Sequence, residues 1–105
     1  MLASPRHLPS LADLSTYVNE TLCHQFQLER DVFPIRLRIL LRGNRPCGVL
    51  FRIRGPGSLV LIAIWDIDTN AVLFYGPCGE RFHKTQLLVA PELDRSGPKA
   101  AGIRA

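Results

Sequence analysis

The spacing of apolar residues changes from a helical to an alternating period at Pro34, and this change constrains the fold more than any other feature of the sequence. Between Ser10 and about Arg30 the apolar residues recur three or four positions apart, as on one face of a helix: Leu11, Leu14, Val18, Leu22 and Phe26. Ser10 is a suitable N-cap, and Asp13 would lie near the positive end of the helix dipole. Because Pro34 cannot continue a helix, we predict one amphipathic helix before it.

Beyond Pro34 the chain reads as short strands separated by turns rich in Gly, Pro, Asn and Asp. The strand-like segments are 35–42, 49–54, 59–65, 72–75 and 81–89. Connections this short join antiparallel neighbours, because parallel strands need long crossovers. We therefore predict an α+β fold, in which the N-terminal helix packs on a five-stranded antiparallel meander sheet that is open or curled toward a half-barrel.

The length and composition permit one globular domain. The chain has 105 residues, of which 47% are hydrophobic, and no linker-like stretch divides its middle. Residues 1–9 carry two prolines, residues 91–105 are small, polar and marked by Gly and Pro, and neither segment has a periodic apolar pattern. We expect a domain over residues 10–90 between two flexible tails.

Three features favour a cytoplasmic protein that does not enter a membrane. The longest apolar run, residues 59–65, is too short to span a bilayer. Residues 1–9 lack the apolar core of a signal peptide. The three cysteines form no close pair, which is typical of a reducing compartment rather than of a disulfide-stapled secreted domain.

Positive charge is concentrated in one part of the chain. The net charge is +4, but six arginines and no acidic residue lie between Val32 and Trp65, so this window carries +6 and the remainder −2. Strand alternation places most of these arginines on one sheet face, and they are our candidates for binding an anion or nucleic acid: Arg36, Arg38, Arg42, Arg52 and Arg54. Ordinary solvation of an outer sheet face is the alternative.

The first hairpin is expected to oppose like charges. With its turn centred in 43–46, Arg36 would face Arg54 and Arg38 would face Arg52. Directly opposed like charges cost from a few tenths to about 1 kcal/mol per pair. A register shift of two residues would leave every side chain on the same face but would remove these opposed pairs. Whether the arginines oppose each other therefore depends on the position of the turn.

The arginine-bearing face also carries more apolar residues than one helix can cover. Five strands span roughly 24 Å, whereas a helix covers about 10 Å. The expected interface residues on this face are Leu40, Leu50, Val60, Ile62, Ile64 and Phe74, with Phe82 added if the pairing continues in phase. We expect this surplus to be buried by curling, by a tail or by self-association into a homodimer.

Candidate catalytic and metal-binding residues are few. Cys78 and His83 form the one conceivable nucleophile pair, but no orienting carboxylate accompanies them. Pro-Cys-Gly occurs at 46–48 and again at 77–79, with one thiol each and at opposite ends of the expected meander, so we predict no metal and no cofactor. Asp66 and Asp68 fit a turn better than a carboxylate pair for catalysis.

The sequence therefore predicts a non-enzymatic binding or assembly module. Protein interaction, including homodimerisation through an exposed sheet face, is the first hypothesis. Binding of an anionic polymer such as nucleic acid by the first hairpin is the alternative. The aromatic residue nearest the arginines, Phe51, would point to the face opposite Arg52, which weakens a stacking role.

Overall fold

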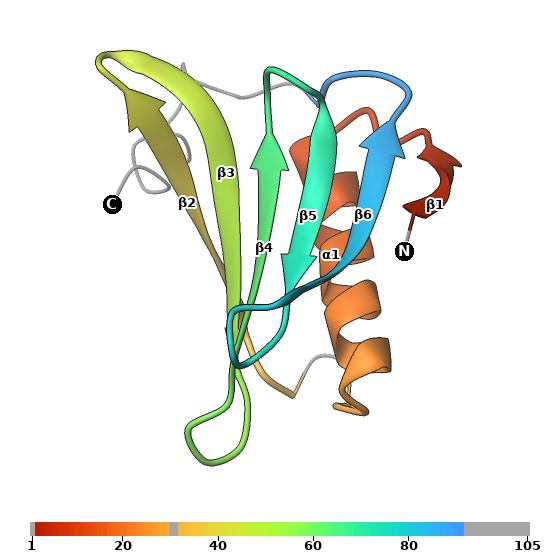
Figure 1. Cartoon of the computed structure of the whole chain (residues 1–105), viewed down its shortest axis with the longest axis vertical. Coiled ribbons are helices and arrows are strands. Elements are labelled where there is room, and N and C mark those ends of the chain that lie inside the picture. The colour runs from red at the N-terminus through yellow and green to blue at the C-terminus, as the bar shows by residue number, and fades with distance from the viewer. Residues whose placement is uncertain (1, 30–31, 92–105) are drawn as a thin grey trace.

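One helix lies against one face of a six-stranded sheet in the computed structural model, which describes residues 2–29 and 32–91 (Figure 1). The elements are β1 (Leu2–Arg6), α1 (Leu11–Gln25), β2 (Ile35–Arg42), β3 (Arg45–Arg54), β4 (Val60–Asp66), β5 (Ala71–Tyr75) and β6 (Arg81–Leu87). The strand order is β1-β6-β5-β4-β3-β2, and each adjacent pair from β2 to β6 is antiparallel. The predicted α+β fold with a meander sheet is thus confirmed, and the sheet is not closed into a barrel.

The sixth strand, β1, is absent from the fold predicted from the sequence. Residues 2–6, which we expected in a loose tail, pair in parallel with β6, and the Leu88 amide donates to the carbonyl of Arg6 at 2.8 Å. Pro5 is acceptable here because an edge strand needs ladder hydrogen bonds on one side only. The C-terminal tail expected at 91–105 lies, apart from Pro91, outside the described residues.

The helix begins where the sequence predicts and ends earlier. The Oγ atom of Ser10 accepts a hydrogen bond from the Asp13 amide at 3.0 Å, as expected of an N-cap. At the other end Gln27 adopts φ 56°, and the Leu28 amide donates to the carbonyl of Cys23 at 2.9 Å. This is a Schellman ending, in which a left-handed residue lets the next amide satisfy a helix carbonyl.

The core lies between α1 and the facing side of β3, β4 and β5. The helix contributes Leu14, Val18 and Leu22, each fully buried. The sheet contributes the alternate residues of its central strands: Val49, Phe51, Ile53, Leu61, Ala63, Trp65, Val72 and Phe74. The apolar face of the helix and the apolar sides of the strands therefore pack together in one layer. Because these faces are buried, the helical and the alternating periods appear clearly in the sequence.

The turn between β4 and β5 sets the phase of β5. Asp66 accepts bonds from the Asp68 amide at 3.2 Å and the Thr69 hydroxyl at 3.0 Å, which confirms the turn interpretation of this acidic segment. Asn70 then closes the turn with φ 52°. As a result Phe74 pairs with Ala63 on the helix side and is fully buried.

Two aromatic residues assigned to the arginine-bearing face therefore lie elsewhere. The prediction of Phe74 as an interface residue is wrong, because the turn puts Leu73 rather than Phe74 on that face. Phe82 also packs toward the helix side, with its ring 5.3 Å from that of Phe26. A bulge in the β5–β6 pairing beside Phe74 changes the phase at this point.

Candidate functional site

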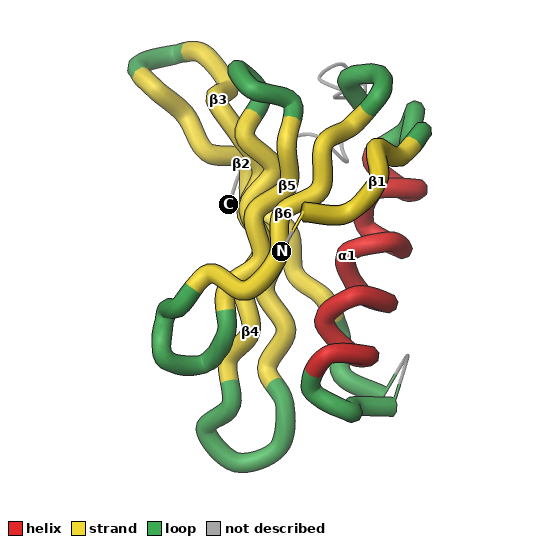
Figure 2. Tube along the Cα trace, turned by 45° about the vertical axis from the view of Figure 1, so that its right-hand side comes forward, coloured by secondary structure: helices red, strands yellow, loops and turns green. Residues whose placement is uncertain are grey.

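Within the described residues, no helix lies over the sheet face opposite α1 (Figure 2). Strand alternation and register place on it the following residues, here called the open face: Arg36, Arg38, Leu40, Leu50, Arg52, Arg54, Val60, Ile62, Ile64, Leu73, Tyr75 and Lys84. The apolar members are half-buried and the arginines are exposed. The tip of the β2–β3 hairpin and the β5–β6 loop both project on this side (Figure 2).

The open face is organised in rows that cross the strands. Leu50 pairs with Ile64, and Ile64 with Leu73, so three aliphatic side chains stand side by side on β3, β4 and β5. Arg38 on β2 and Lys84 on β6 flank these three residues, and Leu2 of β1 pairs with Lys84 beyond them. The centre of this row is therefore aliphatic, and its two margins, at Arg38 and Lys84, are cationic.

The pairing of β2 with β3 differs by two residues from the expected register. Arg36 lies opposite Arg52, and Arg38 lies opposite Leu50. The predicted Arg36–Arg54 and Arg38–Arg52 pairs are wrong, because the hairpin loop contains only residues 43–44 and a bulge follows Leu40. Two opposed arginine pairs remain in this hairpin: Arg36–Arg52 and, beside the turn, Arg42–Arg45.

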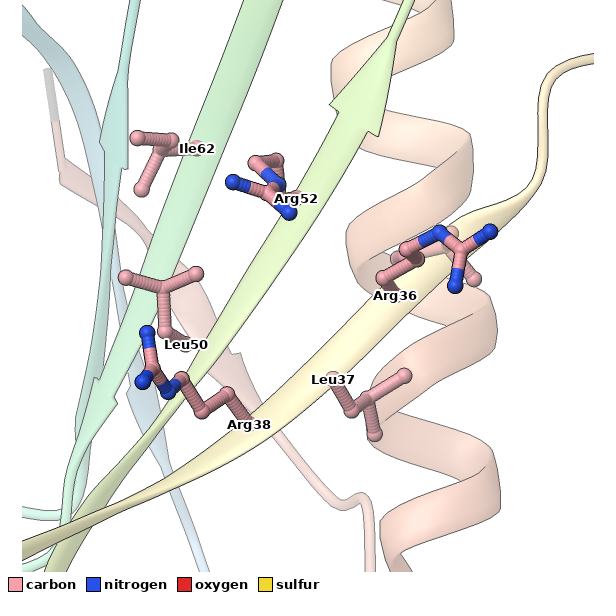
Figure 3. A pocket seen from close by; sticks show the side chains of 7 residues that line it. Arg36, Leu37, Arg38, Leu50, Arg52 and Ile62 are labelled. Carbon is pink, nitrogen blue, oxygen red and sulfur yellow. The ribbon is translucent and has the colours of Figure 1, made fainter. Parts of the chain in front are cut away.

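Three arginines of the open face surround a hollow of about 500 Å³. Its lining consists of Ile35, Arg36, Leu37, Arg38, Leu50, Arg52 and Ile62. In Figure 3 the side chains of Arg38 and Arg52 extend over the sheet toward Leu50 and Ile62, whereas the guanidinium of Arg36 points away from them. The hollow thus combines an aliphatic base with cationic sides.

The arginines of the hollow have no acidic partners in the part of the chain that the structure describes. Outside the hollow, in the described part of the chain, an ion pair joins Arg42 to Asp68 at 3.5 Å, with side chains 77% and 66% exposed. An ion pair this exposed contributes little stability. Arg42 is therefore separated from the other candidates: it lies at the hairpin tip and does not line the hollow. Arg54 is on the open face but is also not part of the lining.

Cys78 and His83 lie in different elements, the β5–β6 loop and β6. Cys78 lies exposed in the β5–β6 loop, where its amide donates to Glu80 Oε1 at 3.0 Å. His83 is half-buried in β6 beside Phe74, with ring centroids 5.4 Å apart, and burial lowers the pKa of its imidazole. Within the described ranges no hydrogen bond joins the two residues.

The cysteines are also separated from one another. Cys47 belongs to β3 near the hairpin tip, and Cys78 to the β5–β6 loop; these two segments lie at opposite ends of the sheet in Figure 1. Among residues 2–29 and 32–91, no three His, Cys, Asp or Glu side chains gather as metal ligands would.

Most aromatic side chains lie on the wrong face for stacking nucleic-acid bases. Phe51, Trp65 and Phe74 are buried beneath α1. Tyr75 and Leu73 are on the open face, where the sequence pattern alone did not place them. The length of the 67–70 turn determines which residues of β5 lie on the open face, and this length was not fixed by the sequence pattern.

Comparisons with known proteins return no family model, no curated protein and no solved structure that matches this chain. Within the described residues, no helix combines the length and the apolar character needed to cross a membrane.

Proposed function

We propose that this protein is a non-enzymatic binding module that forms a homodimer through the open face. The observation that carries the proposal is the row Leu50, Ile64 and Leu73 at the centre of the sheet. In the described part of the chain no element lies over this row. Protein interfaces are depleted of Lys, Asp and Glu and enriched in Arg. An aliphatic row with arginines around it has this composition.

The arrangement of charges favours one way of packing two copies. If two open faces met with their rows aligned, the cationic margins at Arg38 and Lys84 would lie over those of the partner. If the sheets crossed near a right angle at Ile64, the aliphatic rows would meet and the margins would stay apart. Orthogonal packing of two sheets is a standard arrangement, with about 10 Å between them.

The experiment is sedimentation equilibrium over a wide concentration range, with Ile64→Arg as the disrupting variant. We expect the native chain to be dimeric and Ile64→Arg to be monomeric while keeping its circular dichroism spectrum. The matched control is Thr16→Arg, which adds the same charge at an exposed position of α1. A native chain that stays monomeric, or an Ile64→Arg variant that dimerises normally, would contradict the proposal.

Salt provides a second measurement of the same interface. Burial of apolar surface is strengthened by sulfate and is insensitive to screening of charges. We therefore expect the dimer to persist or tighten in sodium sulfate. Dissociation with rising salt would instead indicate that charge pairs hold the assembly.

A second candidate function is binding of an anionic polymer by the arginines of the hollow. The observation that favours it is the direct opposition of Arg36 and Arg52, with no carboxylate beside either within the described residues. Such binding should weaken steeply as salt rises, because counterions are released from phosphates.

The test is binding of a fluorescent single-stranded oligonucleotide to the double variant Arg36→Ser with Arg52→Ser. Loss of binding in this variant, with retention in Arg45→Ser with Arg81→Ser, would support the candidate. The second variant removes the same charge from exposed positions that do not line the hollow. Equal binding by both variants would rule out the hollow as the site.

A further inference from the structure

The strand β2 is an open edge of the sheet. It has eight residues and stands last in the strand order, so among the described residues only β3 pairs with it (Figure 1). In an antiparallel pair every second residue directs its N–H and C=O groups away from the partner strand. β2 therefore offers a row of backbone donors and acceptors to a further strand.

The two sides of this edge have different chemistry. Arg36 and Arg38 point to the open face and are exposed, whereas Ile35, Leu37 and Ile39 point toward the core and are half-buried. The hollow reaches both sets, because Ile35 and Leu37 line it together with the arginines. A strand added here would place successive side chains alternately beside guanidinium groups and beside aliphatic groups.

A second copy of β2 would oppose like charges at this edge in its central antiparallel registers. When two copies of β2 pair antiparallel, a two-fold axis passes through one central residue. Residues equally far before and after that centre then face each other across the two chains. If the centre lay at Arg36 or Arg38, that arginine would face its own copy; if it lay at Leu37, Arg36 would face Arg38. Each of these registers opposes like charges, which destabilises the pair. The sequence of β2 therefore disfavours edge-to-edge association of identical chains.

We propose that β2 receives an extended segment of a protein partner in which carboxylate residues alternate with apolar residues. Its backbone continues the hydrogen-bonded ladder, and such main-chain bonds supply affinity in strand addition. Its carboxylates pair with Arg36 and Arg38, which have no acidic partner in the described part of the chain. Its apolar residues extend the aliphatic row of Ile35, Leu37 and Ile39. This proposal does not rest on the homodimer, because the backbone edge of β2 is distinct from the aliphatic row at the centre of the open face, although Arg36 and Arg38 belong to that face as well.

The probe is a fluorescein-labelled peptide of ten residues in which glutamate alternates with valine, measured by fluorescence anisotropy. We expect saturable binding that weakens at least tenfold when lysine replaces glutamate. A peptide of the same composition with its glutamates in one block should also bind at least tenfold more weakly. Equal binding of the alternating and the block peptide would overturn the proposal, because general attraction to the arginines would then explain both.

N-methylation of the peptide tests backbone pairing without altering the protein. Two versions carry methyl groups on alternate residues, so that each blocks the N–H groups of one edge of the added strand. We expect one version to bind like the parent peptide and the other to lose at least tenfold in affinity. Equal affinities of the two versions would exclude strand addition.

Protein variants locate the site. Arg36→Ser with Arg38→Ser should weaken peptide binding at least tenfold, and Arg45→Ser with Arg81→Ser should leave it within twofold. Hydrogen exchange should show new protection of β2 amides in the bound state. Protection confined to other strands, or binding of an oligonucleotide but not of the peptide at these arginines, would overturn the proposal.

Discussion

The hydroxyl groups of Tyr17 and Thr85 share a buried hydrogen bond of 2.7 Å that joins α1 to β6. The Tyr17 ring also meets Phe74 edge-on, with centroids 6.1 Å apart, and the guanidinium of Arg6 lies 4.9 Å from its centre. One helix residue thus contacts β6, β5 and the end of β1. These contacts fix the helix on one face of the sheet, opposite the open face.

Tyr17→Phe should lower the free energy of unfolding by about 1–3 kcal/mol, because the buried Thr85 hydroxyl loses its partner. The double variant Tyr17→Phe with Thr85→Val should lose less than the two single changes together, since neither hydroxyl remains unpaired. Urea denaturation of the four proteins measures the coupling. Strict additivity would show that the bond contributes nothing.

Gln27→Gly should raise the free energy of unfolding by about 0.5–1 kcal/mol. Gln27 holds a left-handed φ of 56°, which glycine adopts without steric cost. Ala12→Gly is the control, because glycine within an exposed helix should instead lower stability by about 1 kcal/mol. Thermal denaturation of both variants distinguishes a local conformational effect from a general effect of glycine. Changes in midpoint temperature of the same sign in both variants would contradict the prediction.

Gly48→Ala should destabilise the protein by about 1–3 kcal/mol, the usual cost of forcing extra atoms into a packed site. A Cβ atom at position 48 would lie 2.6 Å from the carbonyl oxygen of Trp65, and this backbone group cannot turn aside as a side chain would. Ser58→Ala, in an exposed loop, should stay within about 0.5 kcal/mol of the native chain. Chemical denaturation is the measurement, and equal stability of the two variants would refute the clash.

Stability should fall as the pH drops below the usual pKa of histidine. Burial lowers the pKa of His83 from 6.5, so the unfolded chain takes up a proton before the folded chain does. The free energy of unfolding is therefore highest above pH 6.5 and declines as pH falls through the folded pKa. His83→Gln should flatten this slope, whereas His24→Gln, at an exposed helix position, should keep it. Urea midpoints at successive pH values test the difference.

Arg52→Thr should raise stability by a few tenths to about 1 kcal/mol, because it removes the like charge opposite Arg36. The gain should shrink in concentrated salt, which screens the repulsion. Arg54→Thr is the control: Arg54 pairs with Val60 and lies beyond the described pairing of β2 with β3. An equal gain in both variants would mean that the effect is not pairwise repulsion.

The helix and the antiparallel meander were predictable because local chemistry specifies them. Ser10 caps the helix, Pro34 ends any helical continuation, and the alternation of residues 35–42 matches the full extent of β2. The side-chain bonds of Asp66 form within the turn itself, so they too could be anticipated. Each of these features involves residues close in sequence, and each is expressed in periodicity or turn composition.

The candidate site was predictable only in part. Its arginines and most of its aliphatic residues follow from alternation, which assigns a residue to one of two faces. The error at Phe74 arose because alternation cannot carry the phase across a turn whose length is unknown. The Arg36–Arg54 pairing failed for a related reason, since the two-residue loop and the bulge after Leu40 reset the register.

By itself the sequence determined one amphipathic helix, five antiparallel strands and a concentration of arginine on one hairpin. The tertiary structure decided which arginines oppose each other, which aliphatic side chains form the central row, and that residues 2–6 pair with β6. The physical reason is that hydrogen bonding and alternation act along the chain, whereas register and edge pairing depend on contacts between distant segments. Those contacts arise only when the strands pack beneath the helix.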